Sequence, residues 1–347
     1  MTSTPYPLLF APIFKDKVWG GRALEALGKT LPAGNIGESW ELADLDSTSV
    51  SGGGGGAEHS KIINGPLAGQ TIRDAVKQWG RDLLGATKAS ASGAFPLLVK
   101  FLDAREHLSI QVHPSPAYAK ANPGANLKTE CWYILHTAKV AGPGGQMHEP
   151  VIFKGLKPGV TRADLERAIR EERVPEVMQA VPAVVGECHN LPSGTIHALG
   201  AGVVVAEVQT PSDTTFRVYD WAKEYGRKGR ELHVAQSVEC TDFGPAPALA
   251  KLAPGAKRGR LVTTEFFRVD EVRLKAGESL AFADAGAPDA TTRAHAFMVL
   301  AGTGAVRAGG HEEVLTRGQT GLVPAALVPG AALIAASELT ALIVDVS

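Results

Sequence analysis

The chain has 347 residues, of which 44% are hydrophobic and 20% are charged, a composition that builds a globular core and excludes a disordered chain. Its 39 glycines and 22 prolines favour many short strands joined by tight turns. The formal net charge of −1 gives no basic field for binding nucleic acid. Pro324 and Pro329 interrupt the longest charge-free stretch, residues 318–337, so we expect no membrane span.

The cysteines and the first residues indicate a cytoplasmic protein. The first 14 residues carry no basic side chain and contain several prolines, so we expect no signal peptide there. Cys131, Cys188 and Cys240 are odd in number and far apart. They fit a reducing compartment and form neither a disulfide framework nor a thiolate zinc site.

In chain order, the first half predicts short strands interrupted by one helix and one ordered loop. The expected strands are residues 37–42, 95–104, 108–114 and 129–136. Residues 70–85 predict the helix, because their apolar side chains recur on one helical face. Residues 115–128 read as the ordered loop.

The second half predicts a small helical insertion within further strands. Thr161 fits the N-cap of a helical block over residues 161–181, which Pro175 divides in two. Residues 184–219 return to strand patterning, and strands and turns alone are expected from about residue 260. The expected fold class is therefore mainly β.

A weak internal repeat predicts two similar β units. Residues 186–197 read Gly-x5-Pro-x-Gly-x2-His, which resembles the second sequence signature of the cupin barrel. Residues 318–329 repeat the spacing with Ala326 and Pro329 at the second glycine and the histidine. We expect two cupin-like (jelly-roll) barrels: residues 1–158 and 184–245 form the metal-binding catalytic barrel, 159–183 the helical insertion, and 246–347 a second, metal-free barrel.

Four side chains form a candidate metal site. Gln111 and His113 share one face of a strand because they are two residues apart. Glu130 begins the next apolar strand, where a carboxylate is costly unless it is paired or ligated, and His197 follows the Gly194 turn. The set suits catalytic Zn²⁺ and also approximates the two-His-one-carboxylate site of non-haem iron oxygenases. A purely structural alternative is a polar barrel rim with Glu130 paired to a basic residue.

Six other histidines are predicted to lie in loops or at turn edges without a ligand partner. They are His59, His136, His148, His189, His295 and His311.

Arg217 is a second candidate. If residues 215–221 form a strand, Arg217 and Tyr219 share a face. An arginine that faces a barrel interior needs an anion. That anion is either a carboxylate, with Glu207 and Asp213 as candidates, or a substrate phosphate.

Eight ordered segments resemble type I phosphomannose isomerases, most closely the short bacterial form with a small helical insert. They are residues 7–21, 36–42, 63–69, 95–114, 128–135, 191–200, 209–221 and 230–233. From residue 260 onward the resemblance is only to a generic second cupin unit.

The resemblance implies a zinc enzyme, with one Zn²⁺ per chain, that interconverts mannose 6-phosphate and fructose 6-phosphate through an enediol. It places the metal ligands at Gln111, His113, Glu130 and His197, the active-site arginine at Arg217, and a lysine beside the ligand glutamate at Lys128. Leu127 departs from the glycine common in short forms, which leaves the geometry of that loop open.

The remaining roles follow from the chemistry of the reaction. The base that moves the proton between C2 and C1 stays open among Glu207, Lys128, His113 and a water ligand of the metal. Arg217 and Lys128 are expected to divide phosphate binding and enediolate stabilisation between them, and Ser109 to hydrogen-bond the phosphate. The expected partner is a phosphorylated hexose, not nucleic acid or membrane. Two alternatives are a cupin Fe(II) dioxygenase and a non-catalytic sugar-binding cupin.

Overall fold

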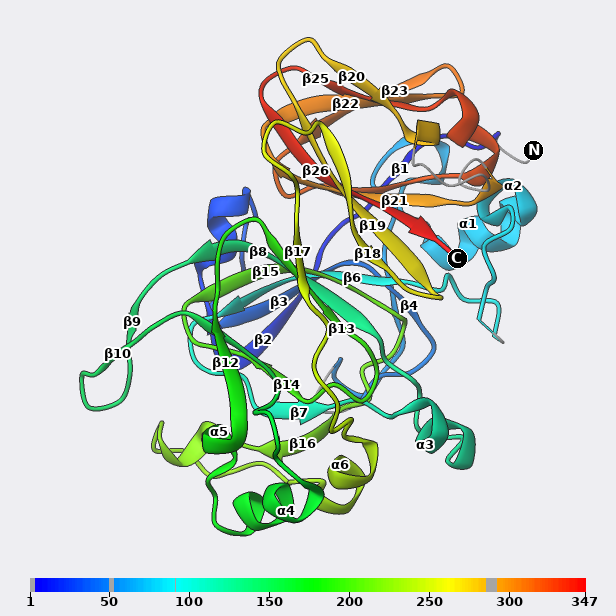
Figure 1. Ribbon diagram of the computed structural model, residues 1–347. Helices are drawn as coiled ribbons and strands as arrows, with labels where there is room; N and C mark the ends of the chain where they lie inside the picture. The colour runs from blue at the N-terminus through cyan, green and yellow to red at the C-terminus, as the bar shows by residue number, and fades with distance from the viewer. Residues whose placement is uncertain (1–3, 50–52, 91, 285–291) are drawn as a thin grey trace.

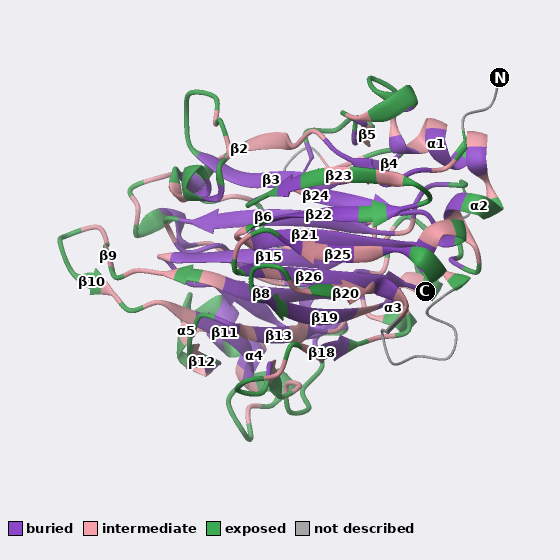
Figure 2. Cartoon of the chain, turned by 90° about the horizontal axis from the view of Figure 1, so that it is seen from above, coloured by how far each residue is buried: buried purple, intermediate pink, exposed green. Residues whose placement is uncertain are grey.

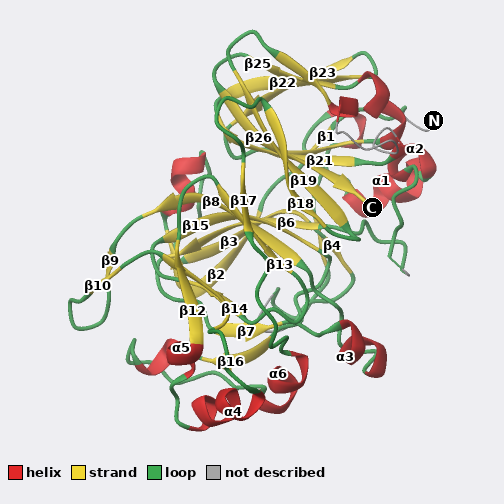
Figure 3. Cartoon of the chain, in the orientation of Figure 1, coloured by secondary structure: helices red, strands yellow, loops and turns green. Residues whose placement is uncertain are grey.

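A computed structural model of the protein describes residues 4–49, 53–90, 92–284 and 292–347. Its strands form four main sheets stacked in layers, with helices at the two ends and along one side of the stack (Figures 1 and 3). The fold is mainly β, as the sequence predicted. None of the described helices is both long enough and apolar enough to span a bilayer.

The first pair of sheets comes mostly from the N-terminal two thirds of the chain. The seven-stranded sheet has the order β17 (Leu249–Lys251), β13 (Glu187–Leu191), β8 (Glu130–Thr137), β15 (Val203–Gln209), β6 (Leu98–Ala104), β3 (Ile36–Leu42), β2 (Ile13–Gly21). The five-stranded sheet has the order β12 (Met178–Pro182), β11 (Val151–Leu156), β14 (His197–Leu199), β7 (Ile110–Val112), β16 (Phe216–Tyr219).

Strand alternation explains how this pair of sheets packs. Val203 and Val205 of β15 join Trp132 in a core that the five-stranded sheet also lines. Val204 and Val208 point the opposite way, into a core that includes the C-terminal part of the chain. Because side chains two apart share a face, Glu207 lies on the same inner face as Val203 and Val205.

The second pair of sheets comes mostly from the last 90 residues. The six-stranded sheet has the order β1 (Leu8–Leu9), β24 (Thr320–Val323), β21 (His295–Ala301), β26 (Leu339–Val346), β19 (Phe267–Leu274), β18 (Arg258–Thr263). The four-stranded sheet has the order β20 (Ser279–Ala281), β25 (Ala332–Ala335), β22 (Thr303–Ala308), β23 (His311–Thr316). Most strands of the six-stranded sheet are buried, whereas β23 at the edge of the four-stranded sheet is largely exposed (Figure 2).

The six-stranded and seven-stranded sheets share one apolar core. It contains Phe101 and Tyr133 from one sheet and Phe267, Met298 and Val344 from the other, all at most 5% exposed. Pairing also crosses between the two parts, since β1 joins the six-stranded sheet beside β24 and β17 joins the seven-stranded sheet beside β13. None of the four sheets closes on itself within the described residues.

The helices cover the ends of this stack. The outer face of the five-stranded sheet packs against α4 (Arg162–Arg170), α5 (Val174–Val177) and α6 (Val234–Cys240), whereas α1 (Ile72–Trp79) and α2 (Arg81–Leu84) lie beside the C-terminal sheets (Figure 3). The remaining elements are α3 (Pro116–Ala121), the two-residue strands β4 (Asp44–Leu45), β5 (Glu58–His59), β9 (Val140–Ala141) and β10 (Met147–His148), and the 3₁₀ helices η1 (Ala23–Leu27), η2 (Gly65–Leu67), η3 (Trp221–Lys223), η4 (Phe282–Asp284) and η6 (Ala325–Gly330).

Thr161 caps α4 as predicted, because its side chain accepts from the Asp164 amide in a capping box. Pro175 lies in the first turn of α5, which follows the break after α4. The predicted helical block was wrong beyond residue 177, since Met178–Pro182 pairs with β11 as strand β12. A short run that pairs with a neighbouring strand forms a strand whatever its helical periodicity.

Several smaller predictions were also wrong. Strand β2 precedes the strand expected first. The loop expected at 115–128 contains α3, which Ser115 caps, and the region after 260 contains 3₁₀ helices. Of the six histidines expected in loops or at turn edges, five lie at or next to a strand end, and the prediction fails for His189, which lies at the centre of β13.

Candidate active site

Three buried ligand-type side chains meet inside the first pair of sheets. His113 follows β7 directly, Glu130 begins β8 and His197 begins β14. Nε2 of His197 lies 3.0 Å from one Glu130 oxygen, and Nε2 of His113 lies 3.5 Å from the other. Their candidate ligand atoms all lie within 4.8 Å of one another. The sequence therefore placed these three residues together correctly.

Backbone carbonyls orient both imidazoles. Nδ1 of His113 donates to the Thr214 carbonyl at 3.0 Å, and Nδ1 of His197 donates to the Thr195 carbonyl at 2.7 Å. The protonated Nδ1 leaves each Nε2 with a free lone pair, which is how metal-binding histidines are usually held. Burial and the charge of Lys128 lower the pKa of His113 to about 3, so its ring is neutral. Its Nε2 has no hydrogen-bond partner, and a cation beside Glu130 would satisfy it.

Glu130 is also paired with a lysine. Nζ of Lys128 lies 2.8 Å from a Glu130 oxygen. Burial would raise the pKa of Glu130, but Lys128 and His113 outweigh it and hold the pKa well below its ordinary value. The structural alternative, a glutamate paired to a basic residue, thus accounts for Lys128. It does not account for two imidazole lone pairs aimed at the same carboxylate, so the set fits a metal ion.

Gln111 and the Gly194 turn complete this centre. Gln111 is the direct cross-strand neighbour of both His197 and Arg217, and its amide nitrogen lies 3.4 Å from Nε2 of His197. Rotation of the amide by 180° presents its oxygen there instead. Gly194 has a φ of +93°, a left-handed conformation that glycine adopts without strain, and it leads the chain into β14.

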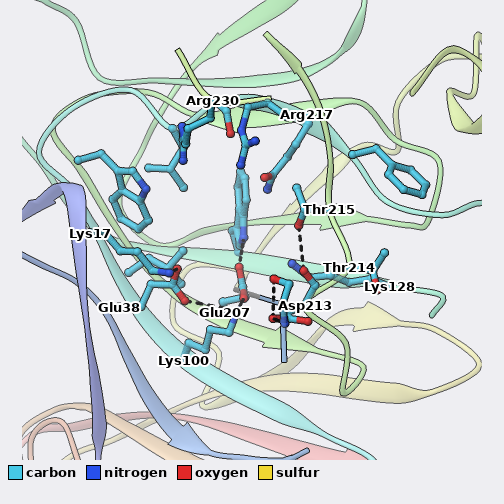
Figure 4. A pocket seen from close by; sticks show the side chains of 18 of the residues that line it. Lys17, Glu38, Lys100, Lys128, Glu207, Asp213, Thr214, Thr215, Arg217 and Arg230 are labelled. Atoms are coloured by element: carbon cyan, nitrogen blue, oxygen red, sulfur yellow. Dashed lines mark hydrogen bonds and ion pairs between the residues drawn. The ribbon is translucent and has the colours of Figure 1, made fainter. Parts of the chain in front are cut away.

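A cavity of about 300 Å³ adjoins the three ligands, between the seven-stranded and five-stranded sheets. Five of the predicted site residues line it: Ser109, Gln111, Lys128, Glu207 and Arg217. Arg217 and Arg230 lie on one side, and Lys100, Glu38 and Glu207 lie on the opposite side (Figure 4).

The opposite wall carries an ion-pair network that sequence reasoning missed. Nζ of Lys100 lies 3.0 Å from Glu207 and 3.7 Å from Glu38, and Lys17 lies 3.5 Å from Glu38. Trp132 donates its indole N–H to Glu207 at 2.8 Å. The sequence does contain a signal for this network, because Lys100 interrupts the apolar run of residues 95–102. A lysine in a buried strand predicts a carboxylate partner nearby.

Electrostatics keep two members of this network, Glu38 and Lys100, charged. Burial would raise the pKa of Glu38, but Lys100 and Lys17 outweigh it and lower the pKa to about 2. Burial would lower the pKa of Lys100, but Glu207 and Glu38 raise it above the ordinary value. The Glu207 carboxylate is therefore fixed at the cavity by one ammonium and one indole.

Arg217 has no carboxylate partner in the described structure. Its Nη1 donates to the Glu231 carbonyl at 2.8 Å, and its buried Nε has no partner. Burial and the nearby Arg230 lower its pKa to about 10. Asp213 instead accepts from the Ser49 amide, and Glu207 is paired with Lys100. The carboxylate pairing that the sequence left open for Arg217 is thus wrong, which leaves the cavity as the place for its anion.

Fold and site together define a mainly β protein in which a buried His/Glu/His set adjoins a cavity rich in cations. The family model for the catalytic domain of type I phosphomannose isomerase matches residues 8–141. The chain is 35% identical over 246 residues to mannose-6-phosphate isomerase ManA of Bacillus subtilis, covering 70% of each chain. It is 32% identical over 329 residues to mannose-6-phosphate isomerase of Streptococcus mutans, covering 92% of each. The chain belongs to the type I phosphomannose isomerase family, which confirms the resemblance drawn from its motifs.

Two solved isomerase structures have a similar fold. The mannose 6-phosphate isomerase of Bacillus subtilis matches with a TM-score of 0.78 and 27% identity, over 97% of this chain and 98% of that one. A phosphomannose isomerase from Salmonella typhimurium matches with a TM-score of 0.70 and 18% identity, over 98% of this chain and all of that one. The second likeness shows the fold alone.

Proposed function

We propose that this protein is a zinc-dependent mannose-6-phosphate isomerase that interconverts mannose 6-phosphate and fructose 6-phosphate through an enediol. The observation that carries the proposal is the buried His113, Glu130 and His197 set beside a cavity rich in cations, in a chain of this family. The family also argues against an Fe(II) dioxygenase, which would leave the surrounding cations without a role. A non-catalytic sugar-binding protein would have no need of a complete ligand set.

His113, Glu130 and His197 would hold one Zn²⁺ per chain, with Gln111 as a fourth, weaker ligand. Bound there, Zn²⁺ would supply Lewis-acid stabilisation of charge that develops on the substrate oxygens. The imidazole rings of His113 and His197 are already oriented for this role, because the Nδ1 atom of each is hydrogen-bonded to a backbone carbonyl. The rings would therefore need no rotation to bind the ion.

The cavity offers cations for both the phosphate and the reacting oxygens. Arg217 has an unpartnered Nε and a planar fork suited to phosphate or to a diolate. We assign Arg217 to the enediolate and Lys128 to the phosphate, with the Ser109 hydroxyl as a further donor to the phosphate. All three line the same cavity.

Glu207 is the proton acceptor in this proposal. Its carboxylate reaches the cavity and is held by Lys100 and Trp132, so it needs no reorganisation to accept a proton. The C2 proton of the aldose passes to Glu207 and returns to C1, while the hydroxyl proton passes from O2 to O1. Lys128 is a poorer base because its ammonium is paired with Glu130 at 2.8 Å.

The same proposal includes the finer architecture. The two pairs of sheets correspond to two cupin-like jelly-roll units, of which residues 1–158 and 184–245 form the catalytic one and 246–347 the metal-free one. The segment 159–183 is the helical insertion. Within the described residues, the one His/Cys/Asp/Glu group arranged to hold a metal lies in the first unit. A cytoplasmic location, with a phosphorylated hexose as partner, completes the proposal.

Metal analysis of the purified protein together with a coupled mannose-6-phosphate isomerase assay tests this function. We expect zinc at one per chain and turnover that chelation abolishes and zinc restores. His197→Ala should lose metal and turnover together, since it removes one of the three converging ligands. The buried but unclustered His295→Ala serves as control. Iron with O₂ consumption would instead support the dioxygenase, and full metal occupancy in His197→Ala would remove His197 from the ligand set.

A further inference from the structure

A second cavity lies at the other edge of the first pair of sheets. Its volume is about 200 Å³, and it shares no lining residue with the cavity described above. Strands β11 and β12 form one wall, and β13 and the chain before β17 form the other. The lining residues are Lys154, Gln179, Val181, His189, Ala246, Pro247, Ala248 and Leu249.

Lys154 places an unpaired ammonium in this cavity. It lies on β11 directly opposite His197 of β14, so its side chain points into the space between the two sheets. The residue is 4% exposed, and its Nζ has no hydrogen-bond or ion-pair partner among the described residues. Burial lowers its pKa to about 8. A buried ammonium without a partner is costly, so a protein retains one chiefly where something pairs with it.

His189 adds an unpartnered ring on the facing strand. It lies opposite Trp132 on β8, is 1% exposed, and neither ring nitrogen has a hydrogen-bond partner. Burial and the Lys154 charge lower the pKa of His189 to about 4, so at neutral pH its ring is neutral and offers one N–H donor and one acceptor. Lys154 and His189 are thus close enough to interact electrostatically. The buried nitrogen atoms of both side chains have no hydrogen-bond partner in the described structure.

The rest of the lining contains no carboxylate that could pair with Lys154. Gln179 supplies an amide, and the other side chains are apolar. A small anion is the ligand that one ammonium, one imidazole N–H and one amide would recognise. We propose that this cavity binds a small oxyanion, with inorganic phosphate as its simplest form, through Lys154 Nζ and His189. The inference stands apart from the proposed function, because the site contains none of the catalytic residues.

Phosphate titration by calorimetry on the full-length protein, at pH 7 in a chloride buffer free of phosphate and sulfate, tests the proposal. We expect a binding event that Lys154→Met weakens at least about tenfold, the scale of losing a charge-assisted hydrogen bond. Lys251→Met, the same change at an exposed position of β17 outside the cavity, should bind as the wild type does. Phosphate that enters the catalytic cavity is distinguished by Lys128→Met, which removes the proposed phosphate-binding lysine of that cavity and should leave the Lys154-dependent event intact.

Thermal denaturation provides a second readout. Phosphate should raise the Tm of wild type and of Lys251→Met by more than that of Lys154→Met, which keeps only the catalytic cavity. If Lys154→Met does not fold, His189→Phe takes its place, with weaker phosphate binding as the expected result. Phosphate binding that is unchanged in Lys154→Met, or that disappears entirely in Lys128→Met, would overturn the proposal, as would the absence of any binding to the wild type.

Discussion

Lys100 is the residue on which the charges of the cavity's far wall depend. It is 5% exposed and lies within 4 Å of two carboxylates, those of Glu207 and Glu38. In Lys100→Met both would remain buried, and Glu38 would keep Lys17 at 3.5 Å. Removing one partner of a buried ion pair costs about 3–5 kcal/mol. We expect urea unfolding at pH 7 to show a loss of this size.

The pH dependence of that loss identifies its cause. The pKa of Glu38 is about 2 in the folded protein against an ordinary 4.5, so its pairing stabilises the fold above about pH 4.5 and is lost as the pH falls toward 2. The difference in unfolding free energy between wild type and Lys100→Met should therefore shrink between pH 5 and pH 3. Lys139→Met, at an exposed pair with Glu149, should cost under about 1 kcal/mol. A Lys100→Met loss independent of pH would indicate packing instead.

Substitution of Arg217 distinguishes a role in catalysis from a role in substrate binding. Arg217→Lys keeps the charge but loses the planar fork. If the guanidinium stabilises the enediolate, kcat should fall by roughly 10²-fold with little change in KM or metal content. Steady-state kinetics and metal analysis check this, with Arg227→Lys, outside the cavity, as the matched control. A near-native kcat with a raised KM would instead assign Arg217 to the phosphate and leave Lys128 as the enediolate partner.

The turn before β14 is the element that positions His197. Gly194 has a φ of +93°, and an added Cβ would lie 3.1 Å from the Cys240 carbonyl oxygen. Gly194→Ala should therefore displace the turn as well as strain it. Because the Thr195 carbonyl that orients His197 belongs to this turn, we expect zinc affinity to fall roughly tenfold to a hundredfold. Competition with a chromogenic chelator measures the change.

Gly159→Ala is the control that introduces the strain of a positive φ without displacing a neighbouring atom. Gly159 has a φ of +82° with no heavy atom within 4 Å of an added Cβ, so its substitution should cost about 1–3 kcal/mol of stability and leave zinc affinity unchanged. Equal zinc affinities for Gly194→Ala and the wild type would show that the turn does not set the position of His197.

Local patterns predicted the elements whose position depends on near neighbours in sequence. Gln111 and His113 follow from strand alternation, His197 from its turn, and α4 from the Thr161 cap. The network of Lys17, Glu38 and Lys100 was missed because its members come from three strands that are neighbours only through the order of the sheet. The same limit hid β12, which is a strand because β11 pairs with it.

At the scale of the whole molecule, the C-terminal part buries its six-stranded sheet against the sheet that carries Glu130 and Glu207. The core between them contains Tyr133, whose hydroxyl donates to Glu271 of β19 at 2.9 Å. Neither face could be exposed to water without losing this apolar contact. The two parts should therefore unfold together, although the sequence predicts them as separate barrels.

The tryptophans allow this cooperativity to be measured. All five lie between residues 19 and 221. Trp79 of α1 lies in the core shared with the C-terminal part, and the other four belong to the first pair of sheets and its surroundings, so the fluorescence reports mainly on the N-terminal part. Phe267, fully buried on the C-terminal side of the shared core, offers a remote perturbation. Phe267→Ala should lower the unfolding free energy by about 3–5 kcal/mol. The fluorescence transition in urea should shift to the same lower midpoint as the circular dichroism transition.

The half-exposed Phe243, 36% exposed, gives a matched control, since Phe243→Ala should cost under about 1 kcal/mol. If the two parts were independent domains, Phe267→Ala would split the transition. Circular dichroism would then show an early phase from the C-terminal sheets, and tryptophan fluorescence would keep its wild-type midpoint. Coincident shifts require that the free energy lost at Phe267 is felt at Trp40 and Trp132, beside the catalytic cavity. In that case the C-terminal part contributes to catalysis by holding the seven-stranded wall of the cavity in place.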